Sequence, residues 1–301
     1  MGALALEELA ALLKDSDPTP IPARIGATDI DQVRSATQAF ESQSRTYGGG
    51  SVRGPAMAQL RWSAGLLEST CPDRLRRELF SAVGDLADMA GFLAVDFGAQ
   101  EEGRRAYGFA LACAEQAEDW PLRAEILSSM TKQAIWTGQP DEGLTLAEQA
   151  LVRPDRLTAT VRALLHNDRG RALAKMHRVD EALTAVGTAD EHFAHSTPDN
   201  DPPSIYYNAA RHAQLTGHSL ADLAILGRDP GEATDRLAAA AGFTGTDDTR
   251  SRAICLTKLA SLTIVTGDPL QAAAIGHAAV DLAGTIRSRR AAAEATSEAT
   301  P

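Results

Sequence analysis

The sequence predicts an all-α protein, built as a tetratricopeptide-like solenoid of helical hairpins. A turn motif that opens with Gly or His and continues into polar or acidic residues recurs at residues 98–102, 138–142, 177–181, 227–232 and 267–271. Successive motifs are 40, 39, 50 and 40 residues apart, somewhat more than the roughly 34 residues of a tetratricopeptide unit. Apolar residues make up 44% of the chain and aromatic residues only 5%, which favours stacked helices rich in Ala and Leu over strands.

Each repeat is expected to contain one helix, a Gly-capped turn and a second helix with an acidic first turn, which suits the positive end of the helix dipole. A small side chain stands twelve residues after four of the motifs and thirteen after the other, where two helices can approach closely. These residues are Ala110, Ala150, Ala189, Ala240 and Ala279.

The elements before the repeats are expected in the following order. A short apolar helix over residues 4–13 and a Pro-rich connector over 15–22 make residues 1–27 a separate N-terminal region. A helix capped by Thr28 or Asp29 runs to about Arg45 and stops at the three glycines 48–50. A second helix covers residues 55–67, and a third starts near Pro72, whose missing N–H costs little in a first turn.

The helical-repeat domain is expected over residues 28–290. Its 50-residue step contains an insertion, the exposed loop at 196–203, which is rich in Pro and Asp. Residues 291–301 consist mainly of Ala, Thr, Ser and Glu without apolar spacing, which predicts a disordered tail or, as the alternative, a frayed helix.

Charge and composition exclude several functions. The net charge is −11, and a chain without a basic domain is a poor ligand for nucleic acid, so direct nucleic-acid binding is not expected. The three cysteines form no CxxC pair, and the His192–His195 pair lacks a third ligand at a recognised spacing, so neither a disulfide framework nor a metal site is predicted. Without a signal peptide or a long apolar stretch, a cytoplasmic protein with no membrane association is expected.

Several stretches resemble a known family. They are Tyr-Gly-Gly-Gly at 47–50 followed by Leu-Arg-Trp at 60–62, Ala-Gly-Phe-Leu-Ala-Val-Asp-Phe-Gly at 90–98, the repeat turns, and Asp-Pro-Pro at 201–203 before an aromatic residue. Over roughly residues 29–290, the chain resembles the C-terminal region of Xre-type transcriptional regulators with tetratricopeptide-like domains from high-GC filamentous bacteria. The resemblance implies a ligand-sensing or dimerising domain. The helix-turn-helix that normally precedes such a domain is not expected among these 301 residues.

Candidate ligand-binding residues follow from the repeat. In such arrays the first helix of each pair lines the concave surface, and positions two and six before the turn residue usually point inward. These positions hold Phe92, Asp96, Lys132, Trp136, Arg171 and Lys175, and we add Asn167, Tyr206, Tyr207 and Arg211 from neighbouring helices. A cation beside an aromatic ring suits a carboxylate or a polar planar ligand, such as a small molecule or a peptide.

Three functions remain open from sequence alone. The main hypothesis is a regulatory sensor, a homodimer that binds a small molecule or peptide. The first alternative is a cofactor-independent isomerase, cyclase or hydrolase, in which Asp96, His166 and His212 would supply acid–base groups. The second is a plain protein–protein adaptor, in which the aromatic residues belong to the core or an interface and the cations to a solvated face. No cofactor is expected in any of the three, because no dinucleotide or phosphate-loop fingerprint is present.

Overall fold

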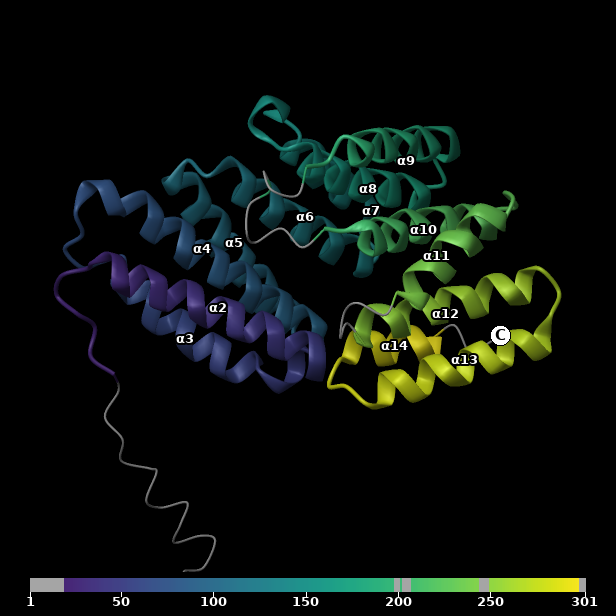
Figure 1. Ribbon diagram of the computed structural model, residues 1–301, viewed down its shortest axis with the longest axis horizontal. Helices are drawn as coiled ribbons and strands as arrows, with labels where there is room; N and C mark the ends of the chain where they lie inside the picture. Colours follow the sequence, from purple (N-terminus) through teal and green to yellow (C-terminus); the bar gives the residue numbers. More distant parts are fainter. Residues whose placement is uncertain (1–18, 198–200, 202–206, 244–248, 298–301) are drawn as a thin grey trace, which may run out of the picture.

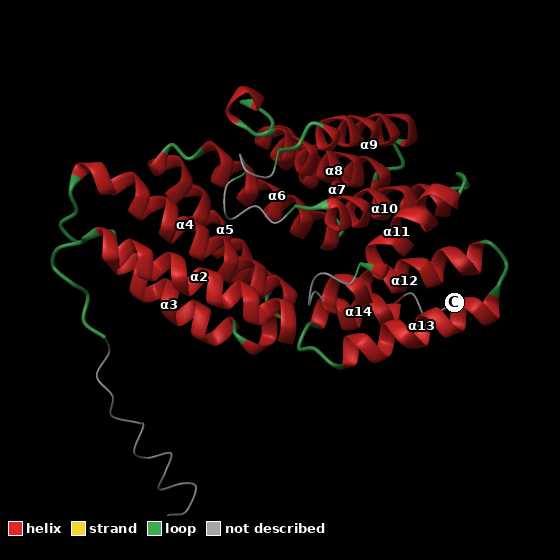
Figure 2. Cartoon of the chain, in the orientation of Figure 1, coloured by secondary structure: helices red, strands yellow, loops and turns green. Residues whose placement is uncertain are grey.

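The protein is helical throughout the part that a computed structural model describes, which comprises residues 19–197, 201, 207–243 and 249–297 (Figures 1 and 2). The extended pairing found in these residues is an isolated bridge between Arg24 and Thr70. The predicted all-α class is therefore confirmed for the described chain. In the same residues, no helix combines the length and apolar character needed to cross a membrane.

The α-helices are, in chain order, α2 (Ala27–Tyr47), α3 (Arg53–Leu66), α4 (Asp73–Asp96), α5 (Gln100–Ala117), α6 (Trp120–Trp136), α7 (Pro140–Ala150), α8 (Ala159–Lys175), α9 (Val179–Ala194), α10 (Ala209–Ile225), α11 (Gly231–Gly242), α12 (Thr249–Val265), α13 (Pro269–Gly284) and α14 (Arg289–Ser297). Two 3-10 turns, η1 (Gly49–Ser51) and η2 (Pro154–Arg156), lie between them.

Most of the chain is organised as consecutive helix pairs. Helix α4 packs on α5, α6 on α7, α8 on α9, α10 on α11 and α12 on α13. The predicted turns separate the members of each pair, and their first residues, four glycines and His177, adopt positive φ. A positive φ favours Gly, so the turn geometry explains why Gly recurs at this position.

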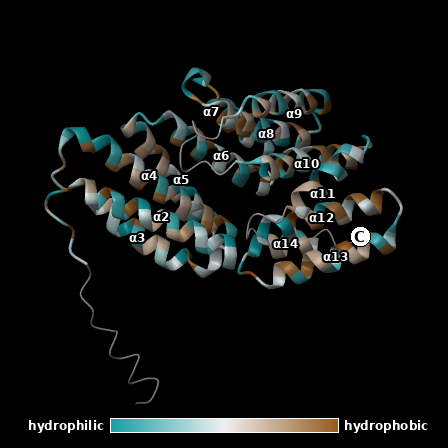
Figure 3. Cartoon of the chain, viewed as in Figure 1, coloured by the Kyte–Doolittle hydropathy of each residue, from teal (hydrophilic) through white to brown (hydrophobic). Residues whose placement is uncertain are grey.

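The pairs are joined through their first helices. Helix α4 contacts α6, α6 contacts α8, α8 contacts α10, and α10 contacts α12, so these helices form an inner layer. The predicted small residues lie in the second helices, where Ala110, Ala150, Ala189 and Ala279 are buried and Ala240 is half-buried. Some apolar side chains stay exposed, and the hydropathy colouring shows apolar stretches on α12 and α13 (Figure 3), where Leu270 is 85% exposed.

The C-terminal end of the array returns to its N-terminal end (Figure 1). Helix α14 contacts α4, and α12 contacts α2. The connection between α13 and α14 lies on the glycine loop: Gly50 N donates to Arg287 O at 2.9 Å, and Arg287 N donates to Tyr47 O at 2.8 Å. A Cβ on Gly48 would come within 2.7 Å of the Arg287 carbonyl carbon, so this close approach requires glycine.

The structure corrects the expectation of a disordered tail after residue 290. Residues 291–297 continue α14, since Ala291 and Ala295, one turn apart, bury their side chains against α12 and α13. Ser288 caps this helix by accepting a hydrogen bond from Ala291 N at 3.1 Å. The sequence pattern of this helix is weak because the side chains at its buried positions are alanines.

Smaller differences concern helix ends. Helix α2 starts at Ala27 and ends at Tyr47, slightly beyond the expected bounds on both sides. Tyr207, which was expected on the helix after the insertion, precedes α10, whose N-cap is Asn208. The helix expected over 4–13 lies outside the described residues, as do most of the Pro-rich loop and Tyr206.

Candidate functional site

A cavity of about 550 Å³ lies between the two ends of the array. Its walls come from α2, α4 and α6 on one side and from residues near the starts of α10, α12 and α14 on the other. A volume of this size is within the range of small-molecule sites, which is roughly 300–1,000 Å³. The cavity is the candidate functional site.

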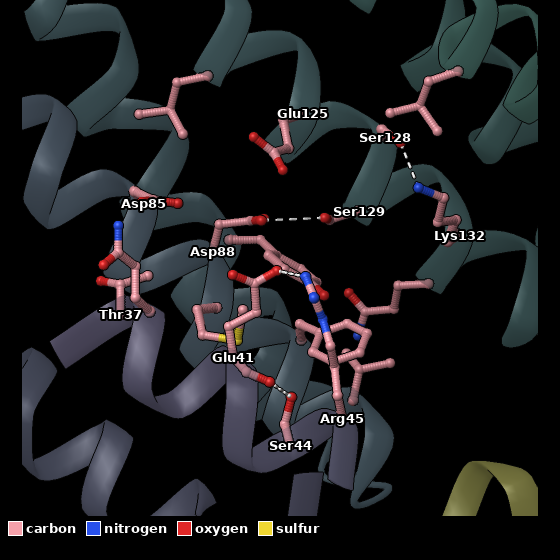
Figure 4. A pocket seen from close by; sticks show the side chains of 18 of the residues that line it. Thr37, Glu41, Ser44, Arg45, Asp85, Asp88, Glu125, Ser128, Ser129 and Lys132 are labelled. Carbon is pink, nitrogen blue, oxygen red and sulfur yellow. Dashed lines mark hydrogen bonds and ion pairs between the residues drawn. The ribbon is translucent and has the colours of Figure 1, made fainter. Parts of the chain in front are cut away.

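One wall of the cavity is acidic. Figure 4 shows Glu41 from α2, Asp85 and Asp88 from α4, and Glu125 from α6 directed toward a common space. Asp119 also lines this wall, but its carboxylate caps α6 by accepting from Leu122 N at 3.1 Å and accepts a second bond from the Ser81 hydroxyl at 2.9 Å. Glu41 forms an ion pair with Arg45.

Asp85 and Asp88 lack comparable partners. Among the described residues, no hydrogen bond or ion pair reaches the Asp85 carboxyl, while Asp88 Oδ2 accepts a long hydrogen bond of 3.4 Å from Ser129 and Asp88 Oδ1 is buried without a partner. Burial, followed by repulsion from Asp88, Glu41 and Asp119, raises the pKa of Asp85 to about 7.

Burial also raises the pKa of Asp88, to about 6, against the opposing effects of its Ser129 hydrogen bond and the nearby Lys132 charge. Asp85 and Asp88 are three residues apart on one helix, so their side chains lie on the same face of α4. The two carboxyls therefore form one titrating pair at the cavity wall.

The other side of the cavity is basic. Arg211 from α10, Arg250 from α12 and Arg290 from α14 line it. Arg250 lies over the Phe92 ring at 4.5 Å, and Arg290 lies over the Trp136 ring at 5.6 Å. Aromatic faces thus hold two of the three guanidinium groups in place.

Lys132 connects the cavity to a buried network. Its Nζ donates to the Ser128 hydroxyl at 2.7 Å, and Ser128 in turn bonds Asp168, which lies 3.8 Å from Nζ. Burial lowers the pKa of Lys132 and raises that of Asp168, because it penalises the charged form of each group. Among the cations that the sequence predicted to face inward, Lys132 therefore has the most polar partners in the described structure.

The structure brings only part of the predicted set to the cavity. Phe92, Lys132 and Arg211 line it, and Trp136 lies against Arg290. Asp96 is buried next to it and serves a structural contact, since its Oδ2 accepts from Gly49 N at 2.8 Å and its Oδ1 from the Ser288 hydroxyl at 2.7 Å.

A second group of predicted residues forms a buried hydrogen-bond network between α8, α9 and α10. The Tyr207 hydroxyl contacts His212 Nδ1 at 2.7 Å and also accepts from Asn167 Nδ2. His212 Nε2 contacts Asp190 Oδ1 at 2.7 Å, and Asp190 is paired with Arg236. Burial raises the pKa of Tyr207 well above its usual value, so the hydroxyl stays protonated and the network braces the fold.

The remaining predicted residues lie away from the cavity lining. Lys175 pairs with Asp222 at 2.9 Å, and Arg171 Nε is buried without a partner among the described residues. His166 stacks on His192 with 5.2 Å between ring centroids, and burial lowers its pKa to about 4. The three catalytic candidates, Asp96, His166 and His212, thus belong to three different networks.

Sequence reasoning missed the whole acidic wall and two of the arginines, Arg250 and Arg290. Several of these missed residues are nevertheless spaced along the sequence by the repeat period. Asp85, Glu125 and Leu164 all line the cavity and are 40 and 39 residues apart, and Arg211, Arg250 and Arg290 are 39 and 40 residues apart. Extending the inward positions along the whole length of each first helix would have found Asp85, Glu125, Arg211 and Arg250, whereas Arg290 lies on α14, beyond the last pair. In the described part of the chain, no group of three or more His, Cys, Asp or Glu side chains converges on a metal site.

Comparisons with known proteins assign no family to this architecture. No protein-family model matches the sequence, and no curated protein matches it. Among solved structures, the crystal structure of BtubC (BKLC) from P. vanneervenii is similar, with a TM-score of 0.44 and 19% sequence identity over 86% of this chain and 92% of that chain. This likeness is too distant to assign a fold family or a function.

Proposed function

We propose that the chain is a tetratricopeptide-like solenoid that binds a small polar molecule or a peptide in the cavity and acts as a regulatory sensor. The solenoid arrangement is supported by the five consecutive helix pairs and their recurring turns. The resemblance to the C-terminal region of Xre-type regulators supports the regulatory role. Its homodimeric form is part of the same proposal.

One observation carries the binding proposal: two carboxyls on the cavity wall, Asp85 and Asp88, receive between them a single long hydrogen bond from the described residues. Burying an ionised group without compensation costs several kcal/mol, and Asp85 and Asp88 carry this cost on the wall of a cavity of about 550 Å³. A protein that only needed a stable core would place apolar side chains there. Charged walls with unused hydrogen-bonding capacity are typical of a site that a ligand completes.

Native mass spectrometry beside the denatured mass tests the proposal. We expect the purified protein, or the protein mixed with a cell extract of small molecules, to carry a bound mass of a few hundred daltons that disappears on denaturation. The Arg211→Gln variant removes a cavity cation and should lose this mass. The matched control is Arg105→Gln on the exposed side of α5, which should keep it.

The same spectra test the dimer. A species of twice the chain mass at micromolar concentration would support a homodimer, and a monomer at all concentrations would remove that part of the proposal. If no bound mass appears with any extract, or if Arg211→Gln keeps the mass as well as Arg105→Gln does, the cavity is not the binding site.

A further inference from the structure

The acidic pair on α4 differs from the other partly or fully buried carboxylates around the inner layer. Asp96 accepts two hydrogen bonds, Asp168 bonds Ser128 and lies near Lys132, and Asp222 is 2.9 Å from Lys175 and 3.8 Å from Lys258. Each of these has a cation or a good donor. From the described residues, Asp85 and Asp88 receive between them one hydrogen bond, the long one from Ser129.

The cations nearest to this pair are committed elsewhere. Arg34, which counteracts the raised pKa of Asp85, lies within 3.5 Å of both Asp31 and Glu78 and its side chain is 43% exposed. Arg45 is paired with Glu41. Lys132 donates to Ser128. Among the described residues, no cation is therefore left to compensate the charge of Asp85 and Asp88.

The oxygen acceptors of the acidic wall favour an ammonium group as the source of the missing positive charge. An ammonium has three N–H donors, and the Asp85 and Asp88 carboxyls, with the Ser81 and Ser129 hydroxyls beside them, offer oxygen acceptors on one side of the cavity. On the other side, Arg290 Nε bonds Glu294 at 3.2 Å and Arg250 Nη1 lies 3.8 Å from Asp96, and the remaining N–H groups of the three arginines can serve as donors to an anionic group. Guanidinium groups bind carboxylates and phosphates with two parallel hydrogen bonds.

We infer that the ligand carries a protonated amine, which lies against Asp85 and Asp88, and a carboxylate or other anionic group, which faces Arg211, Arg250 and Arg290. This assignment rests on the proposed function of the cavity and narrows its ligand to amino-acid-like and peptide-like molecules. Lys132 also lines the cavity and is available to contact such a ligand.

Isothermal titration calorimetry with three probes of equal chain length tests the assignment. The probes are 6-aminohexanoate, hexylamine and hexanoate, titrated at pH 8, where an alkylamine with a pKa of about 10.4 is protonated and the carboxyls are ionised. We expect 6-aminohexanoate to bind most tightly, hexylamine to retain measurable binding and hexanoate to bind least. Asp85→Asn and Asp88→Asn should each lower the affinity for 6-aminohexanoate by at least about tenfold.

The control variant is Asp141→Asn, the same substitution at an exposed position in the first turn of α7. It should bind all three probes as the unmodified protein does. Asn is nearly isosteric with Asp, and circular dichroism establishes that each variant is folded. A second readout is proton release: below pH 7, binding of the amine should expel protons from the carboxyl pair, and the binding heat should depend on the ionisation heat of the buffer.

Three results would overturn the assignment. The first is that hexanoate binds as tightly as 6-aminohexanoate. The second is that Asp85→Asn binds the probes as tightly as Asp141→Asn does. The third is that no probe binds. A fourth arm uses magnesium chloride alone: if Mg²⁺ binds through Asp85 and Asp88 and the amines do not, the missing cation is a metal ion. In each case the bound mass in the native spectra tests the proposed function independently of these titrations. A failure of the ligand assignment can therefore be distinguished from a failure of the proposed function.

Discussion

The Ser288 hydroxyl donates a hydrogen bond of 2.7 Å to Asp96 Oδ1 across 192 residues of sequence. The other carboxylate oxygen of Asp96 accepts from Gly49 N at 2.8 Å. One buried side chain at the end of α4 therefore joins the loop after α2 to the start of α14. This contact holds the two ends of the array together and encloses the cavity between them.

Removing this contact should destabilise the protein. We expect Ser288→Ala to lower the free energy of unfolding by about 1–3 kcal/mol, because it removes both the donor to one oxygen of the buried Asp96 carboxylate and the side-chain cap of α14. Urea denaturation followed by circular dichroism measures the change. The control is Ser42→Ala on the exposed side of α2, which should change stability by less than about 0.5 kcal/mol. Equal effects of the two substitutions would mean that the contact is not formed in solution.

The glycine loop allows a second test of the same closure. Gly48 has a φ of 82°, and its Cβ position lies 2.7 Å from the backbone of Arg287. Gly48→Ala should therefore displace the connection before α14 and speed hydrogen exchange at the Gly50 and Arg287 amides, which bond across it. Gly54→Ala is the matched control, since nothing lies within 4 Å of its Cβ position in α3. This control should leave hydrogen exchange at both amides unchanged.

The Tyr207 network should be structural. Tyr207→Phe keeps the ring that packs edge-on against Phe193 but removes the hydroxyl that contacts His212 and Asn167. We expect a loss of about 1–3 kcal/mol in unfolding free energy, because buried polar groups on both partners lose their bond. Ligand uptake should be unchanged. A Tyr207→Phe protein with full stability and no ligand binding would return Tyr207 to the binding site.

The repeat was predictable because it depends on local properties of the chain. Gly98 and Gly138 mark turns with positive φ, and Ala110 and Ala150 mark close helix contacts. Both features recur at nearly constant positions, with His177 in place of Gly in one unit and Ala240 one residue later in another. Phe92 and Lys132 could be placed on the inner surface from the same period.

The closure was not predictable, because it depends on the sum of small rotations between successive pairs. No local pattern indicates that Arg287 reaches Gly50, so the three glycines at 48–50 were expected only to end a helix. Asp96 was assigned to ligand binding for the same reason: its position points inward, but its partners Gly49 and Ser288 come from distant parts of the chain. The arginine at 290 could be assigned only once α14 was known to be helical and docked.

The acidic pair makes the stability of the unliganded protein dependent on pH. The pKa of Asp85 is about 7 in the folded protein and about 3.9 in an unfolded chain. Between these values the folded state binds more protons than the unfolded state, so the free energy of unfolding falls as pH rises from about 4 to 7. Asp88, with a pKa of about 6, acts in the same direction.

Asp85→Asn should remove part of this dependence. The substitution keeps the size of the side chain and abolishes its charge, so it should stabilise the protein at pH 8 by about 2 kcal/mol, less than the full shift would give because Asp85 faces the cavity and is coupled to Asp88. At pH 4 the carboxyl is protonated in the folded protein and the effect should vanish. Urea titrations at both pH values measure it, with Asp141→Asn as the control. Equal stability of Asp85→Asn and the unmodified protein at pH 8 would show that the carboxyl is already neutralised, and a cation retained through purification would then be sought in the native mass.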